Sequence, residues 1–452
     1  MSKIFAHKAF LTNGWNENVH LTIADGLVQT IQPDCQAEPR DFVADAIIPG
    51  IANAHSHAFQ RALAGHCEHQ GPEGKDNFWS WRVQMYRLAN LISPEDLTSV
   101  ACQAYSEMLA SGYTSVAEFH YLHRDSSDTK EVGRMSEAIF SAAEDTGIRL
   151  TYVPILYERA GFGQPGPLAE QGRFAMDVSE YIEHFESARA RSSASTNIGV
   201  GAHSLRAVSQ ESLAKLADIA GREQCPLHIH IAEQTAEVEQ CLMQHQARPV
   251  EWLFKEFAPN EHWCLVHATH VTSDELESMA RSNAIVCLCP TTEANLGDGI
   301  FPLRDWLELE GHIAIGSDSH ISLNPFEEMR WLEYGQRLSS LSRNVASVPH
   351  NHCGRNLLEK ILEGGAQACG HGATGLQVGL PADLVVLDLD HPMLAGHTSE
   401  SILDALVFSG LDLPISRVMV AGKWQVIDGL HVEHQGIGSE YSKVVDNLWI
   451  AA

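Results

Sequence analysis

Short apolar runs alternate with longer stretches of helical periodicity through the middle of the chain. Two helical stretches span residues 93–112 and 209–224, and the first opens with Ser93 followed by Asp96, which favours a capping box. The eight apolar runs span residues 46–57, 113–121, 149–157, 197–206, 226–233, 263–270, 284–293 and 313–320. A strand followed by a helix, repeated eight times, predicts an α/β fold of the (β/α)8, TIM-type barrel class.

The two ends of the chain follow another pattern, in which short β segments are separated by Gly and Asp turns. Residues 1–48 and 376–440 show this pattern. Because chain termini often lie close together, we expect both ends to pair into one small β-sandwich domain. The barrel is then expected over residues 49–375, with a C-terminal tail over residues 441–452.

Composition and charge narrow the class of protein. The 452 residues are 44% hydrophobic, enough for a sizeable core. A formal net charge of -28 argues against a nucleic-acid partner, which needs clustered positive charge. The sequence shows neither a secretory signal nor an apolar run of about 18 residues, so we expect no membrane partner.

The ten cysteines lack a disulfide framework, which fits a cytoplasmic protein with reduced thiols. Cys287 and Cys289 are expected in a buried strand rather than on a metal.

Histidines and acids gather at the C-terminal tips of the predicted strands, the end at which such barrels carry their chemistry. His55 and His57 are two residues apart on one strand end, so both side chains point to the same side. His228 and His230 repeat this spacing, and Glu233 lies at the turn that follows. The remaining tips carry Glu118, His120, His203, His267 and Asp318.

One H-x-H pair alone is more often a pair of ordinary core or surface residues than a metal site. Ligand types at several other strand tips make a metal site the better interpretation. We expect His230 to be a ligand, Glu233 an acid–base residue and His228 a packed barrel histidine. Histidines with a carboxylate suit one divalent ion, first of all Zn²⁺, with iron and manganese also open. Such an ion lowers the pKa of water, and nearby carboxylates can accept and deliver protons.

Four motifs resemble those of the amidohydrolase superfamily, closest to its deaminases and triazine-hydrolase-like enzymes. They are P-G-x-x-N-x-H-x-H at 49–57, H-I-A-E at 230–233, V-H-A-T-H at 266–270 and G-S-D-S-H at 316–320. The resemblance covers nearly the whole chain. Binuclear members place a bridging lysine on the fourth strand, and the fourth run here has none. The resemblance therefore implies a single metal ion, with the ligands His55, His57, His230 and Asp318.

The same resemblance implies three catalytic roles. Glu233 protonates the departing nitrogen, Asp318 takes the proton of the attacking water, and His267 polarises or orients the reacting group.

Five longer segments narrow the resemblance within the superfamily, at 55–65, 78–87, 117–123, 202–208 and 292–302. They are similar to members that hydrolyse a linear amidine on a dicarboxylate. The implied reaction, in histidine degradation, converts N-formimidoyl-L-glutamate and water into N-formyl-L-glutamate and ammonia. Two carboxylates call for arginines, whose planar fork binds them bidentately. The implied substrate-binding residues are Gln60, Arg82, Tyr121, His203 and Arg206.

Other interpretations stay open. A deaminase or chlorohydrolase of the same architecture could act on a heterocycle such as guanine or a triazine, or the formimidoyl group could be released as formamide. A non-catalytic relative is disfavoured because all four ligands and Glu233 are present.

The two arginines could also have structural roles. Arg82 lies among Trp79, Trp81 and Tyr86 and could be stacked on them, and Arg206 could be a surface residue or lie at the start of a helix. A homodimer is expected because it is common among similar enzymes.

Overall fold

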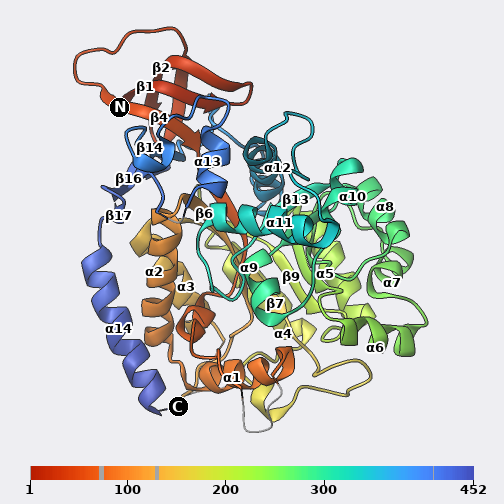
Figure 1. The fold of residues 1–452 in the computed structure, drawn as a ribbon. Coiled ribbons are helices and arrows are strands. Elements are labelled where there is room, and N and C mark those ends of the chain that lie inside the picture. Colours follow the sequence, from red (N-terminus) through yellow and green to blue (C-terminus); the bar gives the residue numbers. More distant parts are fainter. Residues whose placement is uncertain (1, 71–75, 128–131, 411, 452) are drawn as a thin grey trace.

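The computed structural model describes residues 2–70, 76–127, 132–410 and 412–451 (Figure 1). Its inner layer is a parallel sheet whose strands follow one another in chain order, so the predicted barrel is confirmed. A short additional strand, β8 (Thr196–Ile198), pairs with β7. The eight barrel strands are β5 (Ile51–Ser56), β6 (Tyr113–His120), β7 (Arg149–Leu156), β9 (Val200–Ser204), β10 (Leu227–Ile231), β11 (Trp263–His267), β12 (Ile285–Leu288) and β13 (His312–Ile315).

The first and last barrel strands meet at the H-x-H pair. The backbone N–H of Asp318 donates to the carbonyl of His55 (3.0 Å), and the N–H of His57 donates to the carbonyl of Asp318 (3.2 Å). Residues from opposite ends of the barrel sequence are thereby held side by side. The seam that nearly closes the sheet also positions three of the predicted metal ligands.

Helices surround the strands (Figure 1). The capping box predicted at Ser93 and Asp96 forms, with each side chain accepting the backbone N–H of the other residue. Two further elements, η1 (Ala58–Leu63) and α1 (Phe78–Leu91), lie in the connection after β5. The outer helices are α2 (Pro94–Ala110), α3 (Arg134–Thr146), α4 (Val178–Arg189), α5 (Gln210–Glu223), α6 (Thr235–His245), α7 (Pro249–Glu256), α8 (Ser273–Ser282), α9 (Pro290–Leu296), α10 (Leu303–Glu308), α11 (Pro325–Ser340) and α12 (Cys353–Ala368).

Both chain ends contribute to a separate mixed sheet, as expected. In it β4, from the N-terminal end, pairs with β1 on one side and with β14, from the C-terminal end, on the other. Short helical elements, η3 (Pro392–Leu394) and α13 (Ile402–Phe408), follow β14. The strands, in spatial order, are β17 (Leu430–His431), β16 (Lys423–Ile427), β15 (Ile415–Val420), β14 (Leu384–Leu387), β4 (Phe42–Pro49), β1 (Ser2–Leu11), β2 (Gly14–Ala24) and β3 (Leu27–Gln32).

Gly50 separates the two sheets. The first apolar run of the sequence is divided there, because β4 ends at Pro49 and β5 begins at Ile51. A Cβ atom on Gly50 would lie 2.2 Å from Oγ1 of Thr114, so a side chain at this position would clash with the neighbouring strand. The chain can pass from one sheet into the other here only because glycine has no side chain.

The C-terminal residues form α14 (His434–Ala451), which packs against α2 (Figure 1). The segment expected as a tail, residues 441–452, is helical as far as the structure describes it. Tyr441 and Trp449 donate hydrogen bonds to backbone carbonyls of η1. Among the described residues, no helix combines the length and apolar character needed to cross a membrane.

Candidate metal centre and active site

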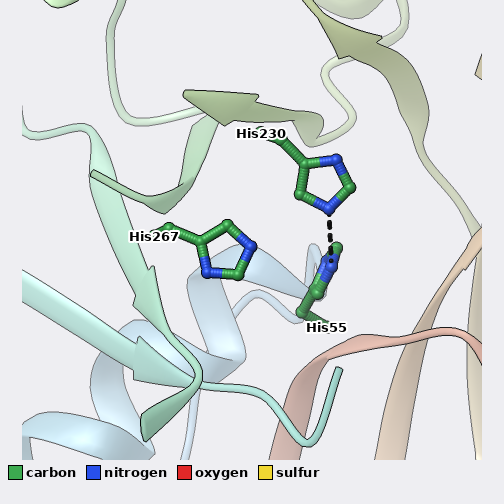
Figure 2. A group of neighbouring side chains, drawn as sticks. All are labelled: His55, His230 and His267. Carbon is green, nitrogen blue, oxygen red and sulfur yellow. Dashed lines mark hydrogen bonds between the residues drawn. The ribbon is translucent and has the colours of Figure 1, made fainter. Parts of the chain in front are cut away.

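The four predicted ligands lie together at the C-terminal ends of the barrel strands. Nε2 of His55 is 3.2 Å from Nε2 of His57 and 3.0 Å from Nε2 of His230 (Figure 2). Oδ1 of Asp318 is 3.2 Å from Nε2 of His57 and 3.6 Å from Nε2 of His55. All four side chains are buried. Three strands, β5, β10 and the end of β13, thus direct one group of nitrogen and oxygen atoms at a common point.

Hydrogen bonds on the far side of two rings show which nitrogen carries the proton. Nδ1 of His57 lies 2.9 Å from the carbonyl of Phe119, and Nδ1 of His230 lies 3.0 Å from the carbonyl of His203. A carbonyl oxygen only accepts, so both Nδ1 atoms donate, and in the neutral rings both Nε2 atoms keep a lone pair. His55 faces both lone pairs and can donate to only one of them. A bound cation removes this conflict.

The protonation states of the predicted ligands favour metal binding. Burial and the neighbouring histidines hold the pKa of His55 and of His230 well below the usual range, so both rings are neutral. Burial alone would raise the pKa of Asp318, but its contacts with the neighbouring His57 and His55 outweigh burial and hold that pKa below its ordinary value. Neutral imidazole and ionised carboxylate are the ligand forms that a divalent ion needs.

His267 lies beside His55 and His230 (Figure 2). It is also close to Glu233. Its Nε2 is 3.6 Å from Oδ2 of Asp318 and 4.0 Å from Oε1 of Glu233, and its Nδ1 is 3.2 Å from Oε1 of Glu293. Burial lowers the pKa of His267, but the three carboxylates outweigh burial and raise it to about 10. A protonated His267 can donate from both nitrogens, which suits the polarising role expected for it.

The C-x-C pair is buried, as expected, but one of its residues lies near this group. Ligand atoms of Cys289, His267 and Glu293 lie within 4.8 Å of one another. Burial raises the pKa of the Cys289 thiol well above its usual range. The thiol therefore stays protonated, which disfavours Cys289 as a ligand.

Arg206 has partners that the sequence did not reveal. Its Nη2 lies 3.6 Å from Oε2 of Glu233, and its Nε lies 3.8 Å from Oε2 of Glu237. Glu237 also accepts the backbone N–H groups of Ala232 (3.2 Å) and Glu233 (3.3 Å). The turn after β10 and the predicted substrate arginine are thus tied to one buried carboxylate. Nothing in the sequence distinguishes Glu237 from other acids in a first helical turn.

A cleft of about 530 Å³ opens beside the ligand group. All five predicted substrate-binding residues line it: Gln60, Arg82, Tyr121, His203 and Arg206. The Gln60 amide donates to the Tyr121 hydroxyl (2.7 Å). The Arg82 guanidinium lies over the rings of Trp79 (4.7 Å) and Tyr86 (5.3 Å), so the stacking considered for it occurs at the cleft wall. Aromatic side chains that sequence reasoning did not place in the cleft also line it: Phe78, Trp81, Tyr86, Tyr157 and Phe174.

Other polar strand residues lie outside the ligand group. His228 is packed as predicted, with Nε2 2.8 Å from the carbonyl of Ala368. Glu118 accepts from the Ser56 hydroxyl (2.5 Å) and from the Ala58 N–H (2.7 Å), the residues on either side of His57. Glu118 therefore supports the segment that carries a predicted ligand.

Comparisons with known proteins agree with this geometry. The amidohydrolase family matches residues 46–425, and the N-terminal domain of formimidoylglutamate deiminase HutF matches residues 1–43. This chain belongs to the amidohydrolase family. Enzymes of this family depend on a metal ion, and the resemblance predicted from the motifs is confirmed. In keeping with the resemblance, β9 contains no lysine.

Two similar proteins place the chain within the amidohydrolase family, and a third shares its fold. Formimidoylglutamate deiminase of Pseudomonas aeruginosa is 45% identical over 453 residues, covering 99% of this chain and 100% of the relative. The crystal structure of an amidohydrolase from Brucella melitensis is 37% identical, with a TM-score of 0.94 and coverage of 99% and 100%. Atrazine chlorohydrolase from Arthrobacter aurescens TC1, complexed with zinc, is 18% identical, with a TM-score of 0.85 and coverage of 98% and 100%. This last likeness concerns the fold alone.

Proposed function

We propose that this chain hydrolyses N-formimidoyl-L-glutamate to N-formyl-L-glutamate and ammonia. The observation that carries the proposal is one cleft in which the His–Asp ligand group meets two arginines, Arg82 and Arg206. Two guanidinium groups match a substrate with two carboxylates. The 45% identity with a formimidoylglutamate deiminase over the whole chain supports the same substrate.

We propose that His55, His57, His230 and Asp318 hold one divalent ion. The converging Nε2 lone pairs fit such an ion, and the set of three histidines and one carboxylate suits Zn²⁺ best. The zinc complex of atrazine chlorohydrolase supports this choice. When bound, the ion acidifies water and polarises the formimidoyl group.

Asp318 and Glu233, which lie on either side of His267, carry out different proton transfers. Asp318 accepts a proton from the water whose oxygen adds to the formimidoyl carbon. Glu233, in its protonated form, gives a proton to the terminal nitrogen, which becomes an amino group. The proton held by Asp318 then passes to this amino group, the bond between it and the carbon breaks, and ammonia leaves. The hydroxyl on the carbon returns its proton to Glu233 as the formyl carbonyl forms. His267 lies within 4.0 Å of both carboxylates and, in its protonated form, donates to the oxygen that gains negative charge.

Substrate binding is assigned to the remaining residues of the cleft. Arg82 and Arg206 bind the two carboxylates of the substrate. Their attraction has to exceed the repulsion between this dianion and the negatively charged chain. Gln60, Tyr121 and His203 supply polar contacts close to the ligand group, since the rings of Tyr121 and His57 lie 4.9 Å apart.

A second candidate is deamination or dechlorination of a flat heterocycle. The aromatic side chains of the cleft favour it, because Phe78, Trp81 and Phe174 offer surfaces on which a ring can stack. Neither Arg82 nor Arg206 has a role with a neutral ring, which is why the dicarboxylate is preferred.

A substrate panel separates the candidates. Purified protein is incubated with N-formimidoyl-L-glutamate, guanine or atrazine, and ammonia, formamide and chloride are measured. The proposal predicts ammonia and N-formyl-L-glutamate from the first compound. Arg82→Gln should raise KM for this substrate, while Arg87→Gln, an exposed arginine on the same helix, should not. Release of formamide, or turnover of a heterocycle in preference to the dicarboxylate, contradicts the proposal.

The homodimer, the cytoplasmic location and the domain limits at residues 48 and 376 stay predictions. All ten cysteines are free thiols in the structure, in keeping with the reduced state expected from their spacing.

A further inference from the structure

A buried glutamine joins two tyrosines in the wall of the cleft. Gln171, the last residue of η2 (Ala169–Gln171), is 0% exposed. Its Nε2 donates to the hydroxyl oxygens of Tyr86 (2.9 Å) and Tyr157 (2.8 Å). Its Oε1 accepts the backbone N–H of Leu168 (2.8 Å). Because that N–H can only donate, the amide has a single orientation, with its nitrogen toward the tyrosines.

The orientation of the amide fixes what the tyrosines can do. Each hydroxyl oxygen accepts a hydrogen from Gln171, so each tyrosine still has its own O–H hydrogen to donate. The Tyr86 and Tyr157 hydroxyls also interact with each other. Among the described residues, no side chain other than Gln171 and the partner tyrosine forms a hydrogen bond with either hydroxyl. Even when one tyrosine donates to the other, one O–H hydrogen is still free to donate. Both tyrosines line the cleft, so that hydrogen can be donated to a bound ligand.

Two guanidinium groups act on the tyrosine pair. The Arg82 guanidinium lies 5.3 Å from the centre of the Tyr86 ring, and the charges of Arg82 and Arg206 both act on Tyr157. Two O–H donors beside the Arg82 guanidinium form a site for an anion with at least two acceptor oxygens, which is a carboxylate.

The aromatic contacts place this site away from the metal ligands. The Tyr157 ring packs on His203 (4.6 Å), which in turn packs on the ligand His230 (5.1 Å). The Tyr86 ring packs on Phe174 (5.7 Å), whose ring lies 5.0 Å from that of Tyr121. Tyr157 therefore lies one ring further from the ligand group than His203, and Tyr86 lies two rings further than Tyr121.

We propose that Tyr86 and Tyr157, oriented by Gln171, bind the side-chain carboxylate of the substrate and make the cleft selective for a dicarboxylate. This inference rests on the proposed function, in which the formimidoyl group lies at the metal ligands. The α-carboxylate is close to that group, whereas the side-chain carboxylate reaches the rings beyond His203 and Tyr121. Gln171 acts only through the tyrosines and is a positioning residue.

Two substrates that differ in one carboxylate test the proposal. N-formimidoyl-L-norvaline replaces the side-chain carboxylate of N-formimidoyl-L-glutamate by a methyl group. The double variant Tyr86→Phe, Tyr157→Phe should lose about 10- to 100-fold in kcat/KM on the glutamate compound, mainly through KM, because a hydrogen bond to a charged group is lost. On the norvaline compound it should match the wild type, and Tyr334→Phe, outside the cleft, should change neither. Equal losses on both compounds overturn the proposal.

A change at Gln171 tests the orientation of the hydroxyls. Gln171→Glu keeps the shape and the acceptor for Leu168, but puts an acceptor where the amide donated. Both tyrosine hydrogens then turn away from the cleft, so kcat/KM for the glutamate compound should fall at least as far as in the double variant. Unchanged selectivity between the two compounds overturns the role of Gln171.

Binding of glutarate separates this inference from the proposed reaction. If the wild type releases no ammonia from the glutamate compound, the proposed function fails, and glutarate still probes the carboxylate site. Weaker calorimetric binding of glutarate to the double variant than to the wild type supports the site. Equal binding by the two proteins overturns it.

Discussion

The Nε2 atoms of His55 and His230 lie 3.0 Å apart, and Nδ1 of His230 donates to a backbone carbonyl, so its Nε2 keeps a lone pair. His57 is held in the same way by the carbonyl of Phe119. The chain thus fixes the tautomers of two predicted ligands through its own backbone, before any ion binds. This is the arrangement by which proteins orient metal-binding histidines.

Two histidines on β10 give a matched test of the metal site. His230→Asn should reduce bound metal to near zero, because a ligand is lost. His228→Asn, two residues earlier and hydrogen-bonded to Ala368, should keep about one ion per chain. Metal content measured by mass spectrometry after gel filtration checks both. Equal metal content in the two variants contradicts the assignment.

Removal of the ion should also lower thermal stability. A ligand present at about 1,000 times its Kd stabilises the folded state by about 4 kcal/mol, so the Tm should fall on chelation and recover with Zn²⁺. Differential scanning calorimetry measures both steps. An unchanged Tm together with full loss of metal argues against this site as a structural and catalytic centre.

Glu233 should be needed for turnover and not for metal binding. Glu233→Gln removes the proton donor for the leaving nitrogen and should lower kcat by about 10²- to 10⁴-fold with the metal retained. Glu239→Gln, at an exposed position of the following helix, is the control and should behave as the wild type. Turnover of Glu233→Gln close to that of the wild type would remove Glu233 from the mechanism.

The C-terminal helix should support the segment that carries Gln60. Trp449 donates to the carbonyl of Ala62 (3.0 Å) and stacks on His66 at 4.1 Å. One neutral hydrogen bond contributes about 1 kcal/mol, so Trp449→Ala should raise KM by about fivefold. Ile450→Ala, whose side chain is 85% exposed on the same helix, should leave KM unchanged. Identical steady-state kinetics in the two variants contradicts the coupling.

Acid should destabilise the fold through a buried histidine. His123 donates from Nε2 to the carbonyl of Ile155 (2.7 Å), and burial together with His184 lowers its pKa from 6.5 to about 3. The unfolded chain binds this proton below pH 6.5 and the folded chain does not, so the stabilisation is complete above pH 6.5 and is lost as pH falls toward about 3.

Urea unfolding at about pH 7.5 and about pH 5 measures the effect. The wild type should lose stability between these values, and His123→Gln should lose less, because glutamine does not titrate. The control is His7→Gln, at an exposed position. A loss in His123→Gln as large as in His7→Gln contradicts the assignment.

The barrel and the ligands could be predicted because their signals are local. Each strand is a short apolar run, and the chemistry of a barrel lies where such runs end, so His55, His230 and Asp318 could be named among the polar strand tips by position. The family resemblance then selected them as ligands. The apolar pattern of residues 46–57 does not show where one strand ends and the next begins, because Gly50 divides that run for a steric reason that appears only when Thr114 lies against it.

The supporting residues could not be predicted, since they act across long sequence separations. Glu237 stands in an ordinary helical turn, and its partner Arg206 is 31 residues away. Gln171 stands in a loop rich in Gly and Pro, and its partner Tyr86 is 85 residues away. Their roles come from burial and hydrogen-bond accounting, which need the fold. The helix α14 was missed because its apolar positions meet α2, far away in sequence.

Release of ammonia from N-formimidoyl-L-glutamate should depend on the bound metal. Ammonia and N-formyl-L-glutamate are measured while chelated protein is reloaded stepwise with Zn²⁺ and its metal content is determined. Turnover should rise in proportion to bound metal and level off at about one ion per chain, with one ammonia for each N-formyl-L-glutamate. Full turnover by metal-free protein, or no ammonia at any metal content, would contradict this prediction.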